Sequence, residues 1–368
     1  MGTLYVVRGE ILSVITPETR AVPGYGVVDI LSDNSLVVGE LTLQPGVTSL
    51  IWCPHEDIAS SWSETLRITE DLPVVAEPNA QTVSKIVVVG KGAEPDYCTF
   101  QLLHDKPVHA FDPVYRCWSE LAPLRTLSRF QAAAKIGERL VLFSNSTSRC
   151  LTPASNKWQN AAINPGYRDL FAVAWWHEAL YLAGGVVSGG CATTQVYHYT
   201  DHWRAKAPLF HRRYGHGLVS QGDYMYAIGG FSSLVMTLSS VERYDPRANE
   251  WQSMASMADP RGDFGVAVVG RSVYVLGGGQ GGGLRISSCE RYDVDRNTWR
   301  PISSLQAPLT DVAACAYEAT IFVFGNYNGT TRVQQYDTAS DTWVDAGPMP
   351  PGLVARTATL MPTACLQL

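Results

Sequence analysis

The sequence predicts an all-β fold in which six similar four-stranded sheets close into a ring, preceded by a small β-rich appendage. Tryptophans recur at spacings of 40, 45, 48, 48 and 44 residues between positions 118 and 343. A glycine pair follows a short apolar run in three of these copies, and the last apolar run, residues 353–360, resembles a strand that the first copy lacks. A period of this length indicates a repeat architecture.

Two adjacent copies show the repeat most clearly. Their glycine pairs end at Gly230 and Gly278, 48 residues apart, and Tyr244 and Tyr292 each stand seven residues before a tryptophan. Two apolar strands precede the pair and two more follow it, so each copy supplies four strands. The residues expected to have structural roles are Gly184, Gly185, Gly229, Gly230, Gly277, Gly278, Trp118, Trp158, Trp203, Trp251, Trp299 and Trp343.

One four-stranded sheet cannot bury both of its apolar faces, but six sheets can do so when they stack as the blades of a β-propeller. A glycine pair at the end of an inner strand lets neighbouring backbones approach closely. The recurrent tryptophans and tyrosines are expected to fill the wedge that widens between blades farther from the axis.

The propeller is expected to span residues 85–361, with a tail at 362–368. Because the first copy starts at Lys85 without a preceding strand, we expect residues 353–360 to pair into it and close the ring. Closure hides sheet edges that an open array exposes.

Residues 1–84 do not join the repeat. They alternate apolar and polar residues between turns, which predicts short strands and then a linker at 70–82. A short helix is expected at 60–68. This part contains no catalytic signature, and its role stays open.

Composition limits the function classes. The net charge is −6 and no basic block stands out, so no nucleic-acid partner is expected. No signal peptide and no apolar run of about 20 residues is visible, which predicts a cytoplasmic protein with no membrane partner. The eight cysteines form no C-x-x-C pair and are expected to be reduced thiols.

About three quarters of the chain resembles the kelch repeat, in its Gly-Gly after an apolar strand, its Tyr-Asp-Pro element and its tryptophan at a fixed offset. The run Val-Glu-Arg-Tyr-Asp-Pro at 241–246 is similar to the propeller of animal kelch-like (BTB–BACK–kelch) proteins. The resemblance implies a substrate-recognition propeller in cullin-RING ubiquitination. Residues 1–84 are too short and strand-like for BTB and BACK domains, so a cullin scaffold is expected only as an indirect partner. The chain is either a shortened form or a stand-alone kelch protein.

The resemblance also implies a protein or peptide ligand at one propeller face, where the loops at 91–107, 186–194, 231–239, 279–286 and 326–331 vary. An acidic ligand is expected because arginines recur in the loops entering the copies, and their planar forks bind carboxylates. The alternative is that these arginines are solvated or pair with Asp and Glu of the same loops. The expected partner-binding residues are Arg129, Arg168, Arg213, Phe231, Arg261, Gln280, Tyr327 and Arg356.

The sequence contains only weak signs of a metal, nucleotide or catalytic site. His198 and His202 lie in a strand-to-turn segment, which disfavours a zinc pair, and the glycine run at 277–283 lacks the Gly-Lys-Ser/Thr ending of a phosphate loop. We therefore expect no enzyme activity, no metal and no cofactor. Two alternatives stay open: an actin- or cytoskeleton-binding scaffold, and a carbohydrate-active or copper kelch enzyme.

Overall fold

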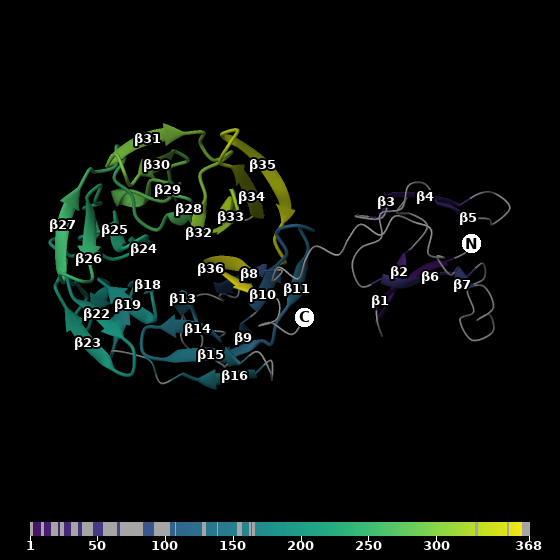
Figure 1. Ribbon diagram of the computed structural model, residues 1–368, viewed down its shortest axis with the longest axis horizontal. Coiled ribbons are helices and arrows are strands. Elements are labelled where there is room, and N and C mark those ends of the chain that lie inside the picture. Colours follow the sequence, from purple (N-terminus) through teal and green to yellow (C-terminus); the bar gives the residue numbers. More distant parts are fainter. Residues whose placement is uncertain are drawn as a thin grey trace. The chain divides into compact units, whose positions relative to one another are not determined.

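The computed structural model consists of two compact units, Met1–Gln81 and Thr82–Leu368 (Figure 1). The residues that the structure describes are 3–8, 11–15, 21–22, 26–30, 36–38, 47–53, 65–66, 84–91, 104–106, 108–126, 130–137, 139–152, 157–161, 163, 166–327, 330–351 and 353–362.

The first unit contains only strands in its described residues, which confirms the β-rich appendage. One antiparallel sheet has the order β2-β1-β6-β7 and a second has the order β3-β4-β5. The helix expected at 60–68 is wrong where that segment is described, because Thr65–Leu66 is a strand paired to Leu50 and Ile51. The strands are β1 (Thr3–Arg8), β2 (Ile11–Ile15), β3 (Ala21–Val22), β4 (Gly26–Ile30), β5 (Leu36–Val38), β6 (Val47–Cys53) and β7 (Thr65–Leu66).

The second unit is a ring of six antiparallel four-stranded sheets, which confirms the expected six-bladed propeller (Figure 1). Blade 1 is β36 (Val354–Pro362), β8 (Ser84–Lys91), β10 (Val108–Phe111) and β11 (Trp118–Glu120). Blade 2 is β13 (Phe130–Ile136), β14 (Arg139–Ser144), β15 (Ser148–Thr152) and β16 (Lys157–Asn160). Blade 3 is β18 (Ala172–Trp176), β19 (Ala179–Ala183), β22 (Val196–Tyr199) and β23 (Trp203–Lys206).

The remaining blades repeat this plan. Blade 4 is β24 (Gly217–Gln221), β25 (Tyr224–Ile228), β26 (Val241–Asp245) and β27 (Glu250–Met254). Blade 5 is β28 (Gly265–Val269), β29 (Ser272–Leu276), β30 (Cys289–Asp293) and β31 (Thr298–Ile302). Blade 6 is β32 (Thr310–Tyr317), β33 (Thr320–Tyr327), β34 (Thr330–Asp337) and β35 (Thr342–Pro348). Smaller elements are β9 (His104–Lys106), β12 (Leu124–Thr126), β17 (Arg168–Asp169), β20 (Val186–Val187), β21 (Cys191–Ala192) and the 3-10 turn η2 (Gly281–Gly283).

Within each blade the first strand of the order above lies nearest the axis and the last lies outermost (Figure 1). The second strands are buried over most of their length, and all five residues of Ala179–Ala183 and of Ser272–Leu276 are buried. Such runs form because a neighbouring blade covers each face of the sheet. One apolar cluster occupies each of the six interfaces between blades, so the core is shared between blades.

The ring closes as expected. β36 pairs antiparallel with β8, with Ala358 opposite Val88 and Leu360 opposite Ile86. On the outer side, the Trp118 Nε1 of blade 1 donates a hydrogen bond to the Pro348 carbonyl of blade 6 at 3.2 Å. Blade 1 is therefore assembled from both ends of this unit.

The six repeat tryptophans begin or lie in the outer strands, and the indole N–H groups of five of them donate to a backbone carbonyl of the preceding blade or of the segment that follows it. Trp203 is the exception among the described residues, since its Nε1 has no hydrogen-bond partner there. Trp251 packs on Tyr244 with ring centroids 4.9 Å apart, and its Nε1 donates to the Ala207 carbonyl at 2.8 Å. Trp299 repeats both contacts one blade later with Tyr292 and Ala255. These tryptophans thus add a polar link to the apolar packing between blades.

The glycine pairs directly follow the second strands of their blades, β19, β25 and β29, as expected for a pair that two strands precede. Gly229 has φ +56°, and a Cβ there would lie 2.6 Å from the Arg261 carbonyl oxygen of the next blade. Gly230 has φ +92°, and its N–H donates to the same carbonyl at 2.8 Å. The pair therefore joins neighbouring blades through the backbone, and a side chain at Gly229 would prevent that contact.

We expect Gly229→Ala to destabilise the propeller by about 2–4 kcal/mol, since it adds a steric clash to the strain of a positive φ. Gly270→Ala is the matched control, because Gly270 has the same φ of +56° and nothing within 4 Å of its Cβ position. Urea unfolding of both variants checks the difference. Equal losses of free energy would mean that strain alone explains the glycine.

Candidate functional site: a loop rim at one end of the propeller

Two sets of loops meet at one end of the propeller. The loops after the glycine pairs, at 186–194, 231–239 and 279–286, contact the segments that lead into the inner strands. Tyr214 and Phe231 exchange backbone hydrogen bonds of 2.9 and 2.8 Å, and Gly262 and Gly279 do the same one blade later. We call these loops, with the entering segments at 167–171, 210–216 and 258–264, the upper rim.

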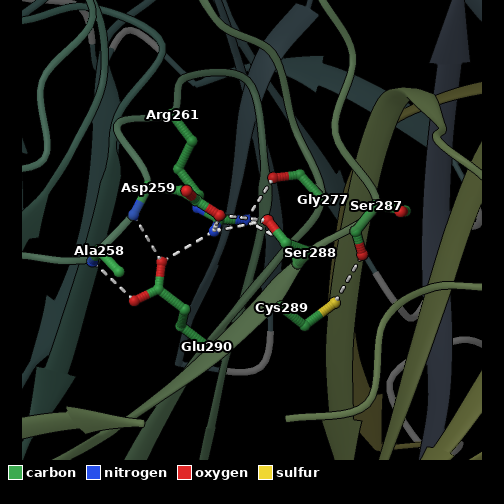
Figure 2. Close-up of polar contacts among 8 residues, drawn as sticks. All are labelled: Ala258, Asp259, Arg261, Gly277, Ser287, Ser288, Cys289 and Glu290. Atoms are coloured by element: carbon green, nitrogen blue, oxygen red, sulfur yellow. Dashed lines mark hydrogen bonds and ion pairs between the residues drawn. The ribbon is translucent and has the colours of Figure 1, made fainter. Parts of the chain in front are cut away.

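The arginines of the entering segments point into the protein. Arg261 is 0% exposed. Figure 2 shows its guanidinium donating to the Gly277 and Ser288 carbonyls, at 3.0 and 2.6 Å, and to Glu290 at 2.8 Å. The Glu290 carboxylate also accepts hydrogen bonds from the backbone N–H groups of Ala258 and Asp259. The pair therefore fastens the entering segment to the third strand, β30.

Blades 3 and 4 repeat this arrangement. Arg213 is 0% exposed and donates to the Gly229 carbonyl at 2.7 Å and to Glu242 at 2.5 Å. Arg168 donates to the Gly184 carbonyl and to the Gln195 side chain, both at 2.6 Å. Burial lowers the pKa of both guanidinium groups from the ordinary arginine value.

This burial corrects the expectation of an exposed basic ring. Arg168, Arg213 and Arg261 satisfy carbonyls and side chains of their own blades, so their guanidinium groups are not presented at the rim surface. The alternative was pairing with Asp and Glu of the same loops, and Arg261 does contact Asp259 of its own segment. The buried partners of Arg213 and Arg261, however, are Glu242 and Glu290 of the third strands. Arg129 and the Arg356 side chain lie outside the described residues.

Glu242 and Glu290 were missed by the sequence analysis. Both are buried and both follow their arginine by 29 residues, within the Glu-Arg-Tyr-Asp run of the third strand. This constant offset between opposite charges was a usable signal, since a buried arginine requires a partner.

The residues that the rim presents near the axis stand two positions after these arginines. Leu170 and Asp263 have φ of +51° and +50°, and Gly215 has φ of +56°. The Gly215 N–H donates to the Leu170 carbonyl at 2.9 Å, and the Asp263 N–H donates to the Gly215 carbonyl at 2.8 Å. The backbones of three consecutive blades are thus joined around the axis, with Asp263 exposed.

A cavity of about 670 Å³ runs between the inner strands. Its wall includes Ala134, Ala174, Ala267 and Ala314, and the small side chains leave the space open. Burial raises the pKa of the wall thiol Cys315 to about 12, so it is protonated at neutral pH. Most of the wall is apolar, and Lys135 and Glu178 are the charged residues among those that line it.

Of the three other expected contact residues, the structure describes the side chains of two. Phe231 is half-buried and stacks on Tyr214 with centroids 5.5 Å apart, over Gly262, where a Cβ would meet its ring. Gln280 is half-buried, and its backbone N–H bonds to the Leu284 carbonyl. The Tyr327 side chain lies outside the described residues. Partner binding by these positions stays a prediction.

A histidine of the rim is buried without partners in the described residues. His216 is 8% exposed, and neither of its ring nitrogens has a hydrogen bond there. Its ring abuts Gly184 of the preceding blade. Burial, and secondarily the charge of Arg213, lower the pKa of His216 well below its usual value.

Acidification is therefore expected to weaken the propeller through His216. The unfolded chain takes up this proton below about pH 6.5 and the folded chain does not, so stability is retained above that pH and lost as pH falls. The limiting slope for one proton is about 1.4 kcal/mol per pH unit. The measurement is urea unfolding between pH 7.5 and pH 5. His216→Phe should flatten the slope relative to the wild type, whereas identical slopes would contradict this prediction.

The described ranges contain no candidate metal site. No group of three or more His, Cys, Asp or Glu side chains there could hold a metal ion. His202 bonds to Asp201 and Arg204, and does not combine with His198. Among the same residues no helix has the length and apolarity to cross a membrane.

Comparison with known proteins agrees with this architecture. A model of the KLHDC2/KLHL20/DRC7 Kelch-repeats domain matches residues 170–362. Kelch-like protein 35 of Mus musculus is 33% identical over 101 residues, which are 26% of this chain and 17% of that protein. Alpha-scruin of Limulus polyphemus is 32% identical over 107 residues, 27% of this chain and 12% of that protein. Kelch-like protein 25 of Xenopus tropicalis is 27% identical over 229 residues, 58% of this chain and 37% of that protein. The matched segments thus span between 12% and 37% of the lengths of these relatives.

Proposed function

Because this chain belongs to the KLHDC2/KLHL20/DRC7 kelch-repeat domain family, we propose that it is a non-enzymatic module that binds a partner protein at the upper rim. The observation that supports this most is the contrast between frame and loops. Blades 4 and 5 repeat the same Gly, Arg, Glu, Tyr and Trp contacts, whereas their rim loops at 231–239 and 279–286 share almost no sequence. Variable loops on a rigid frame are where recognition residues concentrate.

The finer proposal is that the module selects substrates for a cullin-RING ubiquitin ligase. It is supported by the resemblance of the 241–246 run to the propeller of kelch-like proteins. A second protein or domain then has to contact the cullin, because the described strands of the first unit provide no helical adaptor fold. The propeller supplies substrate selection alone.

The test compares two exposed aspartates at opposite ends of the strands. Asp263 lies on the upper rim, and Asp223 lies in the turn between β24 and β25. Asp263→Lys should remove proteins that co-purify with the full chain, and Asp223→Lys should leave them bound. Circular dichroism melting confirms that both variants fold. Identical captured proteins for both variants, or none for the wild type, would contradict rim recognition.

The proposed role in ubiquitination is tested by a separate measurement. A captured partner should become ubiquitinated when the chain is overexpressed in cells, and the Asp263→Lys variant should reduce that modification. A partner that binds but whose ubiquitination and lifetime do not respond would separate protein binding from substrate selection, and would favour a scaffold.

A further inference from the structure

The rim loops of blades 4 and 5 expose large apolar side chains. Leu234 is 88% exposed, Val235 is 83% exposed and Met236 is 59% exposed, at the tip of the 231–239 loop. Leu284, in the 279–286 loop, is 57% exposed. We call these four residues the apolar ridge. Contiguous exposure of this kind is uncommon on soluble proteins and marks surfaces that bind other molecules.

Hydrogen bonds hold the ridge in one conformation. The Ser232 N–H donates to the Met236 carbonyl at 2.9 Å and the Leu238 N–H to the Gly230 carbonyl at 2.8 Å, so the first loop is a tight hairpin. In the second loop the Gln280 N–H donates to the Leu284 carbonyl at 2.8 Å. A preformed surface loses little conformational entropy when a partner covers it.

The glycine run of the second loop lets the two hairpins meet. The Gly281 N–H donates to the Thr237 hydroxyl at 2.8 Å, and a Cβ at Gly281 would lie 2.7 Å from the Val235 carbonyl oxygen. Gly281 therefore allows the blade 4 hairpin to rest on the blade 5 loop. A side chain at this position would push apart the two loops that carry the exposed apolar residues.

The charges beside the ridge indicate what covers it. Arg285 follows Leu284 directly, Arg212 lies in the entering segment of blade 4, and both are exposed. Neither guanidinium group has an ion pair or a hydrogen bond within the described ranges. At the opposite end of the same blades, exposed arginines do have acidic partners, as in Arg247–Asp223 and Arg271–Asp295. Unpaired cations next to an apolar surface favour a partner that brings carboxylates.

We propose that the apolar ridge inserts into an apolar groove of a partner protein whose edge carries carboxylates that pair with Arg285 and Arg212. This inference rests on the proposed protein-binding function and specifies the partner's surface. Val235 and Leu234, the most exposed of the four, are the anchors, because buried apolar side chains at the centre of an interface contribute most of its affinity.

The experiment uses the full chain with the photoreactive amino acid benzoylphenylalanine as the probe, at Val235 or, as the control, at Asp223. A protein crosslinked only from Val235 is purified, and its Kd is measured against the wild type, Leu234→Ser/Val235→Ser and Arg285→Glu. Because the ridge side chains are exposed, all variants should keep the wild-type melting temperature. The double variant should weaken binding on the order of 10–100-fold. Arg285→Glu should weaken it several-fold and reduce its salt dependence.

Each of the following four results would overturn the ridge proposal. A partner that Asp263→Lys releases but the double variant retains leaves rim recognition intact and removes the ridge. A wild-type chain that captures nothing removes both proposals. A dimer in sedimentation that the double variant converts to monomer assigns the ridge to a second copy of the chain. Flotation with vesicles of phosphatidylcholine and phosphatidylserine, lost in the double variant, assigns it to a lipid surface.

Discussion

Replacing Arg261 with alanine is expected to destabilise the propeller by about 3–5 kcal/mol, because it leaves a buried carboxylate without its cation. Glu290 is 3% exposed, and only the backbone N–H groups of Ala258 and Asp259 remain to bond it. The Gly277 carbonyl also loses the Arg261 donor, and the Ser288 carbonyl keeps only the Gly277 N–H. Urea unfolding of the wild type and the variant measures the loss.

Two variants keep this prediction falsifiable. Arg271→Ala removes an arginine that is 67% exposed and pairs with Asp295, so it should cost less than about 1 kcal/mol. Replacing both Arg261 and Glu290 with methionine should recover much of the stability, because no unpaired charge is then buried. A small loss in Arg261→Ala, or a double variant no better than the single one, would show that the ion pair contributes little.

Removing residues 353–368 is expected to abolish the folded propeller. The deletion takes away β36, so β8 loses its inner neighbour, and Leu353, Ala355 and Met361 lose their place in the core. The lost burial and strand pairing amount to about 5 kcal/mol or more. That is comparable with the whole stability of many domains. We expect loss of a cooperative thermal transition, or insoluble protein.

The control deletes only residues 363–368, which leaves β36 complete, and should retain the wild-type melting temperature. A synthetic peptide of residues 350–362 added to the larger deletion should restore part of the transition, since it supplies the missing strand. A larger deletion that still melts cooperatively at the wild-type temperature would mean that five complete blades and an open first blade are stable.

Most of the fold could be predicted from the sequence because its determinants recur at fixed spacing. Trp251 and Trp299 lie 48 residues apart and make equivalent contacts in the structure. The shortened third copy is also explained: Tyr199 pairs directly with Trp203 across a turn of only three residues. Closure followed from a counting argument, since one strand was missing at the start and one was left over at the end.

The direction of side chains could not be predicted in the same way. Arg213 and Arg261 stand in variable segments, as exposed binding residues do, and their Glu partners are 29 residues away in sequence. Only the folded blade brings the entering segment beside the third strand. The loop at 231–239 was expected at the binding face, but the exposure of Leu234, Val235 and Met236 at its tip was not predicted, because it depends on the hairpin hydrogen bonds of the folded loop.

The pairing of β36 with β8 fixes the order of events when the polypeptide is made on a ribosome. β8 (Ser84–Lys91) is synthesised early, but the strand that pairs with its inner edge is completed only after more than 250 further residues have been translated. During that interval the nascent chain exposes an unpaired strand edge that can pair with other chains. Chaperone engagement should therefore persist until β36 has been synthesised, and a stop codon just before β36 should be as damaging as one in an earlier blade.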